Sequence, residues 1–572
     1  ELAARRLDAA ITADGSLGTL ALKTGYLNLG QLTGFYRWLP EPWSGRVGEW
    51  RPDGAVRRLG LTLSPRDDDS FDYRLDAEFE ELGFAAGGSL PGVRGLSGEV
   101  GAESGSGRLL LDMDEFEVTA PDVFAAPLKF RRASGGVTWR SGTRGLAVLS
   151  DALQLEADAF STTSDFEILV PPDDASPEVD LDVTFTVAAL EQMPDYLPSG
   201  RMGPLLVRWF REALLGGRID TGSVTLTGPL DAFPFRDGEG RFEVAADVRD
   251  ATLRYAKPWP VIAIERADVR MDGLKLHTRD NVASTLGVRA SDTRVEMPDV
   301  VRGDLLVEAS ARGDMGSGLS FVRQSPLADL LGPRVADVTG SGDLDVTLDL
   351  FYPIRDRDRF RVDVGVATSD ATLGLNPLGQ SLTKLAGRAT IGRDTLSSED
   401  LSGELLGAPV TIELLPAAPD TGYRAQAIVS GELRSAALRA EFETPLLGAV
   451  DGAAPYRATV RFPGQGNETP VPLTVRVDTD LEGMAVTLPA PLTKAAAVPQ
   501  ATRLDVRFLE DGVIEVGGRY GERAGWLLIF NRDETRWQLT RGNVRAGLAR
   551  PVLPVGRGLF LDGAVDTVRV GD

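Results

Sequence analysis

Apolar and polar residues alternate with a period of two along most of this chain. Over 181–187, Leu, Val, Phe and Val alternate with Asp and Thr, and over 344–350, Leu and Val do the same. Because successive side chains of a strand point to opposite faces, each run predicts a β-strand with one apolar and one polar face. Further runs of this kind lie at 242–248, 360–366, 473–477, 484–488 and 504–508. Gly, Asp, Asn and Pro separate the runs, which predicts a mostly antiparallel β protein.

Helical patterning is scarce. Leu205, Trp209 and Ala213 stand at i, i+4 and i+8 and predict a helix over 204–215, with shorter helical stretches at 29–38 and 326–331. The glycine cluster Gly316-Ser317-Gly318 is interpreted as a turn. So few helices cannot cover so many one-sided strands.

An internal repeat occurs at an offset of 120 residues. Residues 241–253 and 361–373 align without gaps, and six of the thirteen positions are identical, including a shared Asp-Ala-Thr-Leu. The preceding strands align as well, with Val224 and Leu226 falling on Leu344 and Val346. A repeat of this length predicts stacked units of several strands.

Two soft breaks divide the chain. Pro171 and Pro172 begin an acidic connection, and Gly332-Pro333 is a weaker break. They predict three segments: 1–171, 172–335 with the short helix near 204–215, and 336–572.

The composition excludes several function classes. The 84 acidic and 61 basic side chains leave a formal charge of −23, which argues against a nucleic-acid partner. The chain has no Cys and a single His, so thiolate catalysis, cysteine zinc sites and two-histidine metal motifs are excluded. We interpret His277 as a structural strand residue, and we expect no enzyme activity, no metal and no cofactor.

Two acidic clusters, residues 67–69 beginning at Asp67 and residues 112–115 beginning at Asp112, have the residue type of Ca²⁺ ligands or of a glycosidase carboxylate pair. Neither has EF-hand spacing, so solvated turns are favoured. An extracellular adhesin or a glycosidase on a β-solenoid is the function class that these clusters would support.

The apolar strand faces need a cover. Either two sheets close on each other as a sandwich, or one sheet curls into a groove whose interior holds another apolar molecule. A lipid acyl chain meets that need, because about 0.8 kcal/mol per buried CH₂ gives a chain of about sixteen carbons on the order of 12 kcal/mol, close to its gain in a bilayer.

A series of short motifs, rich in Gly, Pro and aromatic residues, occurs in a specific order along the chain. Its members are Tyr196-Leu197-Pro198, Trp209, Ala213-Leu214, Gly217, Gly222, Gly228, Phe233-Pro234-Phe235, Gly240, Phe242, Trp259-Pro260, Ser325-Pro326-Leu327 and Leu488-Pro489-Ala490-Pro491-Leu492-Thr493-Lys494. This series resembles the YhdP family of AsmA-like proteins, with Thr493 standing where Gly is expected. The departure concerns the geometry of a turn.

The resemblance implies an elongated, curled antiparallel β-sheet with a hydrophobic groove, built of repeated multi-strand units with a few short helices. The three segments would then form one continuous groove. It implies a periplasmic conduit that carries phospholipids between the inner and outer membranes of a Gram-negative bacterium. No leader or membrane span is found in the sequence, so we expect the inner-membrane anchor, and the contacts with either membrane or its proteins, to lie outside this chain. The alternative is an AsmA-like scaffold for outer-membrane protein or polysaccharide biogenesis that carries no lipid.

Alternation predicts which side chains line such a groove, because residues i and i+2 share a face. The candidates for contact with phospholipid acyl chains are Leu181, Val183, Phe185, Val224, Leu226, Phe242, Val244, Leu344, Val346, Leu348, Val362, Val364, Val475, Val477, Val506 and Phe508.

Overall fold

The computed structural model divides into two units. It describes residues 4–11, 17–32, 49–66, 71–87, 91–173, 175–200, 202–325, 327–328, 338–375, 379–393, 395–419, 421–441, 445–464, 471–509, 512–533 and 536–564. Unit 1 comprises Glu1–Ala256, Val261–Ala283 and Asp292–Leu305, and unit 2 comprises Lys257–Pro260, Ser284–Ser291 and Leu306–Asp572.

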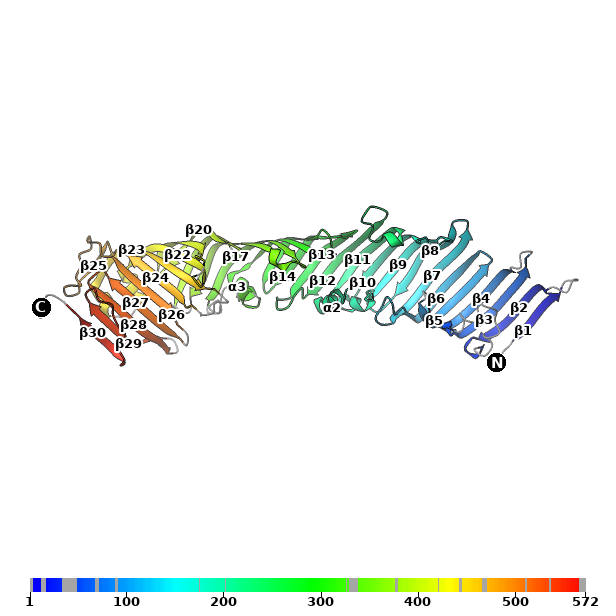
Figure 1. Ribbon diagram of the computed structural model, residues 1–572, viewed down its shortest axis with the longest axis horizontal. Coiled ribbons are helices and arrows are strands. Elements are labelled where there is room, and N and C mark those ends of the chain that lie inside the picture. The colour runs from blue at the N-terminus through cyan, green and yellow to red at the C-terminus, as the bar shows by residue number, and fades with distance from the viewer. Residues whose placement is uncertain are drawn as a thin grey trace. The chain divides into compact units, whose positions relative to one another are not determined.

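Unit 1 contains thirteen consecutive strands in which each strand pairs antiparallel with the next (Figure 1). They are β1 (Ala4–Ile11), β2 (Leu17–Asn28), β3 (Asp53–Pro65), β4 (Phe71–Phe84), β5 (Gly92–Glu103), β6 (Ser106–Thr119), β7 (Leu128–Gly142), β8 (Gly145–Glu156), β9 (Phe160–Val170), β10 (Glu178–Val187), β11 (Leu214–Pro229), β12 (Arg241–Leu253) and β13 (Ile262–Asp272). Three further strands contribute residues to both units: β14 (Lys275–Thr285), β15 (Val288–Met297) and β16 (Asp304–Asp314).

Unit 2 continues the same architecture. Its strands are β17 (Val338–Pro353), β18 (Arg361–Leu375), β19 (Gln380–Gly392), β20 (Leu396–Leu405), β21 (Ala408–Pro416), β22 (Tyr423–Arg434), β23 (Val450–Pro463), β24 (Leu473–Thr479), β25 (Met484–Val486), β26 (Thr502–Phe508), β27 (Val513–Tyr520), β28 (Ala524–Asp533), β29 (Arg536–Ala546) and β30 (Gly558–Gly563). Neighbours pair antiparallel, except that β25 is a short strand on β23, β24 pairs directly with β26, and β30 lies parallel to β29. The predicted mostly antiparallel β fold with few helices is confirmed, and the curl of the sheet stays a prediction.

The helices lie in connections between strands. The longer ones are η3 (Leu190–Tyr196) and α2 (Pro204–Ala213) before β11, α3 (Met315–Arg323) before β17, and α5 (Ser435–Glu441) before β23. Shorter 3₁₀ turns are η1 (Gly30–Leu32), η4 (Leu230–Ala232), η6 (Arg357–Arg359) and η7 (Pro445–Ala449). The longer helices therefore lie in the connections that lead into β11, β17 and β23, six strands apart, which fits a repeated unit of six strands.

The predicted helix over 204–215 is confirmed as α2, which ends at Ala213 because Leu214 and Leu215 already belong to β11. Of the stretch 29–38, the described part holds η1, and most of 326–331 lies outside the described residues. The interpretation of Gly316-Ser317-Gly318 as a turn is wrong, because these residues form the first turn of α3. The helix forms there because the Asp314 carboxylate accepts a hydrogen bond from the Ser317 N–H at 2.9 Å and caps the first turn.

The two repeat copies share the pairing register on one side of the repeated strand but differ on the other side, where the hairpins have different lengths. Val244 pairs with Met271 and Val364 pairs with Ile391, at the expected offset of 120 residues. However, Val224 is the partner of Val244, whereas the partner of Val364 is Leu348. The alignment of Val224 with Leu344 is therefore wrong by four residues. The cause is the hairpin, which runs from Pro229 to Arg241 in one copy and from Pro353 to Arg361 in the other.

Two clusters of buried side chains lie where helices cover the sheet. In unit 1, Val187, Leu190 and Ala251 form one cluster with Met193 of η3 packed against it. In unit 2, Met315 of α3 packs with the core cluster of its repeat copy, which consists of Met315, Leu344, Ala371 and Leu385.

Candidate functional site

One face of the unit 1 sheet is apolar from strand to strand. Directly paired residues of antiparallel neighbours point to the same side, so a chain of such pairs traces one face across the sheet. The chain of pairs from β2 to β11 consists of Leu22, Leu61, Leu75, Ala102, Gly107, Trp139, Val148, Ile168, Val179 and Gly228. We call this side the apolar face; it holds no polar side chain along this row.

The neighbouring row, one residue along each strand, traces the opposite face. From β2 to β12 it consists of Lys23, Gly60, Asp76, Gly101, Arg108, Thr138, Leu149, Glu167, Asp180, Thr227 and Arg241. Apart from Gly60 and Gly101, Leu149 is the one residue of this row without a polar side chain. We call this side the polar face, and the contrast between the rows follows directly from period-two alternation.

The candidates of unit 1 lie together on the apolar face. Leu181 pairs with Leu226, and Leu226 pairs with Phe242, so the three form a row across β10, β11 and β12. Val183, Val224 and Val244 form the adjacent row. Phe185 follows next in β10 and pairs with Gly222. All seven side chains are half-buried, so each keeps part of its apolar surface accessible.

Unit 2 has the same two faces. A row of apolar residues crosses eight strands, from β21 to β29: Leu414, Ala427, Val460, Val475, Val506, Val516, Leu528 and Gly542. The corresponding polar-face row is Thr411, Ser430, Arg457, Asp478, Arg503, Arg519, Gly525 and Arg545.

The structure also places the unit 2 candidates. Leu348 pairs with Val364, Val346 pairs with Val366, Val362 pairs with Leu350, Val475 pairs with Val506, and Val477 pairs with Leu504. Leu344 and Phe508 differ from these, because they are only 5% and 4% exposed and belong to the packed interior. Leu344 is covered because Met315 of α3 packs in the same cluster.

Several large side chains of the apolar face lie over glycines. The Trp139 ring covers Gly107, the Phe185 ring covers Gly222 and the Trp526 ring covers Gly518, each glycine being the direct cross-strand partner. A bulky ring laid over a neighbouring glycine lies along the sheet instead of standing up from it. The sequence pattern does not single out Trp139 and Trp526, because glycines interrupt the alternation around them. The signal that could have found them is the pairing of a Trp with a Gly across a hairpin.

β-bulges recur at matching places in the two repeat copies. Gly217 has φ +126° and lies against Ala251, and Gly342 has φ +101° and lies against Asp370 and Ala371. The pairing register shifts at both positions. Register shifts also interrupt the pairs β3–β4, β4–β5, β5–β6, β7–β8 and β8–β9. A bulge bends its strand and increases the local twist.

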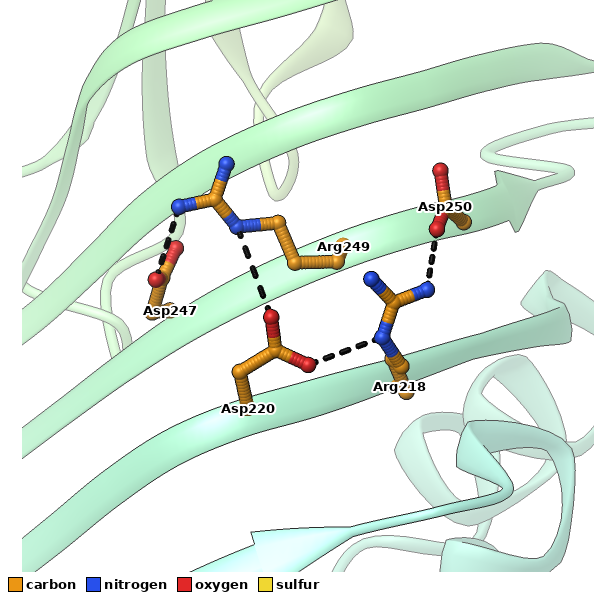
Figure 2. Close-up of polar contacts among 5 residues, drawn as sticks. All are labelled: Arg218, Asp220, Asp247, Arg249 and Asp250. Atoms are coloured by element: carbon orange, nitrogen blue, oxygen red, sulfur yellow. Dashed lines mark hydrogen bonds and ion pairs between the residues drawn. The ribbon is translucent and has the colours of Figure 1, made fainter.

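An ion-pair network lies beside the bulge of β11 and β12 (Figure 2). Arg218 and Arg249 are directly opposite each other in the register, which would be repulsive without acids between them. The Asp220 carboxylate lies 2.8 Å from Arg218 Nε and 3.9 Å from Arg249 Nε, while Asp250 pairs with Arg218 and Asp247 lies 2.8 Å from Arg249. Hydrogen bonds from Arg218 to Asp250 and Asp220 raise the pKa of that guanidinium further. These exposed pairs keep the charges of the polar face balanced.

Aromatic packing joins η3 to the sheet. The Tyr196 ring meets Phe160 edge to face at a centroid distance of 4.7 Å, and Phe130 lies between Phe116 and Phe160. Burial raises the pKa of Tyr196. In this way η3 covers one stretch of the apolar side chains of unit 1.

The segment 488–494 is held by a buried lysine. The Lys494 ammonium donates hydrogen bonds to the carbonyls of Leu481 at 2.7 Å and Met484 at 2.6 Å, and burial lowers its pKa. Tyr520, which lies on the apolar face of β27, donates its hydroxyl hydrogen bond to the Leu492 carbonyl at 3.1 Å. The Thr493 hydroxyl bonds back to the Val486 carbonyl at 3.2 Å, so the turn accommodates Thr at this position.

The acidic clusters do not form a metal site in the described residues. No group of three His, Cys, Asp or Glu side chains suited to a metal ion occurs within the described ranges. The cluster that begins at Asp67 lies outside them. The prediction of a turn at Asp112 is wrong, because 112–115 lies within β6, where Met113 is buried and the Asp112 carboxylate lies 2.9 Å from Arg132. His277 is a strand residue of β14, as predicted, with its Nδ1 atom 3.7 Å from the Asp272 carboxylate.

These observations define a class of protein: a mostly antiparallel β protein that presents an extended apolar sheet face. The chain belongs to the YhdP protein family, whose family model matches residues 1–571. It is similar to the intermembrane phospholipid transporter YhdP of Escherichia coli (strain K12), with 25% identity over 502 residues. That alignment covers 85% of this chain but 38% of the transporter, so the chain spans well under half of its relative's length.

No solved structure matches this chain. Among the described residues, no helix has both the length and the apolar composition that crossing a membrane requires.

Proposed function

We propose that this chain forms part of a conduit that carries phospholipids between the inner and outer membranes along its apolar face. The observation that carries the proposal is the uninterrupted apolar row, which passes through ten neighbouring strands in unit 1 and eight in unit 2. Membership of the YhdP family and similarity to an intermembrane phospholipid transporter support the same substrate class.

The apolar face suits a lipid whose acyl chains move along it. Its candidate side chains are mostly half-buried, so a bound acyl chain would cover apolar surface that is otherwise in contact with water. Transfer of each CH₂ from water gains about 0.8 kcal/mol, nearly the same as entry into a bilayer, so exchange between membrane and protein costs little. A continuous row without a charged interruption offers a path without deep traps.

The recurring bulges favour a curled sheet that forms a groove rather than a flat sheet. Bulges at matching places in neighbouring strands would bend each strand at a similar point, and the sheet would then curl along that line. The apolar face on the inside of such a curl would shield acyl chains, while the polar face would remain in water.

The proposed location is the periplasm, with an inner-membrane anchor in a segment outside this chain. The word intermembrane in the name of the similar transporter supports a place in the cell envelope. In this role the protein binds and guides lipid and needs no catalytic group. The partners are phospholipid and, at the ends of the longer protein, the two membranes or their proteins.

Photo-crosslinking tests the proposal. A photoreactive residue at Phe242 or Val346, both on the apolar face, should capture phospholipid in cells. The same residue at Glu243 or Asp345, one position along and on the polar face, should not. Equal labelling from both faces would contradict the face assignment, and absence of lipid at all four positions would favour the scaffold role instead.

A further inference from the structure

Helix α2 carries an apolar stripe that runs from water into the sheet. Leu205, Trp209 and Ala213 share one side of the helix at i, i+4 and i+8, and they are 72%, 40% and 0% exposed. Leu206, in the same N-terminal turn as Leu205, is 46% exposed. The stripe is therefore open to solvent at the N-terminal end and buried at the C-terminal end.

The buried end of the stripe joins the apolar face. The residue after Ala213 is Leu214, which begins β11 and pairs with Leu253 of β12. Leu253 shares a face with Ala251, which belongs to the buried cluster beneath η3. The stripe thus continues without a polar interruption onto the side that carries Phe242 and Val244.

The helix is held in this position from its C-terminal half. The Trp209 indole N–H donates to the Tyr255 carbonyl at 2.9 Å, and the Arg254 N–H donates to the Ala213 carbonyl at 2.9 Å. On the flank, Arg211 lies 3.0 Å from the Asp195 carboxylate. These contacts leave the first turn, with Leu205 and Leu206, exposed to solvent.

The corresponding helix of the next repeat copy does not have this exposed stripe. In α3, Met315 is 8% exposed and Leu319 packs against the same core cluster, so the helix lies down on the sheet. Exposure of the apolar side chains of α2 is therefore not a general property of helices in these connections.

A cation accompanies the exposed end of the stripe. Arg208 stands three residues after Leu205, on the adjacent side of α2, and is exposed. Within the described residues it forms no hydrogen bond or ion pair, although the chain as a whole carries a net charge of −23. An apolar stripe beside an unpaired cation matches the chemistry of one ligand class, in which an acyl chain is joined to an anionic phosphate.

We propose that α2 is a lateral entry site for single phospholipid molecules, and this inference rests on the proposed function. The acyl chain lies along Leu205, Trp209 and Ala213 toward the apolar face, while the phosphate binds Arg208. From Leu205 to Ala213 the stripe rises about 12 Å at 1.5 Å per residue, so it spans much of one acyl chain.

The test compares the rate of lipid loading between variants of the whole purified chain. Lipid-free protein is mixed with vesicles of phosphatidylglycerol and phosphatidylethanolamine in equal amounts, and bound phospholipid per chain is followed by native mass spectrometry. The double change Leu205→Ser with Leu206→Ser should slow loading about tenfold, which corresponds to about 1.4 kcal/mol, since it removes the exposed apolar surface of both side chains. Arg208→Glu should slow loading as well, and Arg208→Lys should restore it in part because it keeps the positive charge.

Two control variants match these changes elsewhere in unit 1. Leu230→Ser changes a leucine that is 44% exposed and lies in η4, which follows the C-terminal end of β11. Arg108→Glu reverses the charge of an exposed arginine on the polar face. Both should load at the original rate. Because all the altered side chains are exposed, unchanged hydrogen exchange in β11 and β12 should show that folding is intact.

The outcomes separate this inference from the proposed function. Normal loading of the α2 variants, with lipid still captured by a photoreactive residue at Phe242, would overturn the entry site and leave the conduit standing. Absence of lipid at Phe242 in the unaltered chain would remove both. If Leu205 and Leu206 were needed for flotation with intact vesicles but not for loading, α2 would be a membrane-docking helix, and the entry site would be overturned.

Discussion

The Asp343 carboxylate shows how single polar residues stabilise the bulged strands. It accepts hydrogen bonds from the Ser369 hydroxyl at 2.8 Å, the Ser369 N–H at 3.1 Å and the Asp370 N–H at 3.1 Å. These bonds, led by the one from the Ser369 hydroxyl, hold the pKa of Asp343 below its ordinary value of 3.8. They tie β17 to β18 where the pairing register shifts.

A lowered carboxyl pKa predicts the sign of a pH effect. The charged form binds in the folded state, so Asp343 contributes stability above its ordinary pKa, and that contribution is lost as the pH falls through the lower folded value. Asp343→Asn should therefore lower the melting temperature at pH 7, and the difference from the original chain should shrink below about pH 4. Differential scanning calorimetry at pH 7 and pH 3 measures both.

Asp349→Asn is the matched control in the same strand. Asp349 is exposed and lies directly opposite Asp363, so its neutralisation removes a like-charge pair. It should not lower the melting temperature at either pH. An equal loss from both changes would show that the hydrogen bonds of Asp343 have no special role.

At the scale of the elements, the bulges determine how strands of unequal local length stay paired. Gly216 and Gly217 are neighbours in β11, yet their surroundings differ sharply. A Cβ atom on Gly217 would lie 2.6 Å from the Ala251 Cα, and its φ of +126° is unfavourable for other residues, whereas a Cβ atom on Gly216 would meet nothing within 4 Å.

This contrast predicts opposite outcomes for two adjacent substitutions. Gly217→Ala should cost about 1–3 kcal/mol or more, because it combines backbone strain with a clash against β12. Gly216→Ala should be close to neutral. Hydrogen exchange of the β11 and β12 amides measures the local opening free energy, and similar protection in both variants would contradict the assigned bulge.

The helices act at the same scale as local covers of the apolar face. Met315 of α3 turns Leu344 into a core residue, whereas Leu348, four residues further along the same strand, stays half-buried. In β17, the helix position, rather than the strand pattern, therefore decides which apolar residues are packed and which remain accessible to an occupant.

For the whole molecule, the central prediction concerns continuity of the apolar rows. Val364 lies in a row with Leu348, Ile391 and Leu396. Val364→Asp places a carboxylate among apolar side chains, at a cost of about 1–3 kcal/mol if it stays unpaired. Folding should survive, because the side chain reaches water, while the proposed transport of lipid along the face should stop.

Capture of lipid on either side of the substitution tests this. In the Val364→Asp variant, photoreactive residues in β12 and in β26 should label unequally in cells, since lipid could no longer pass between them. Val364→Leu keeps the face apolar and should behave like the original chain. Unchanged labelling at both positions in the Val364→Asp variant would contradict a path through Val364.

Local pattern determined much of this protein. A period of two specifies a strand and separates its faces, so Val183, Val224 and Val244 could be assigned to one side without knowing which strands pair. The 120-residue repeat extended that assignment from Val244 to Val364. The amphipathic pattern of α2 was equally local, since i, i+4 and i+8 positions share a side of a helix.

Tertiary structure decided what depends on distant partners. Pairing of Val364 with Leu348 instead of Leu344 follows from a hairpin four residues shorter, and the change keeps the same face because four is an even number. Burial of Leu344 follows from the placement of Met315, and the turn expected at Gly316 became a helix because Asp314 caps it. Alternation sets the face of a residue, but only register and covering elements set its neighbours and its contact with water.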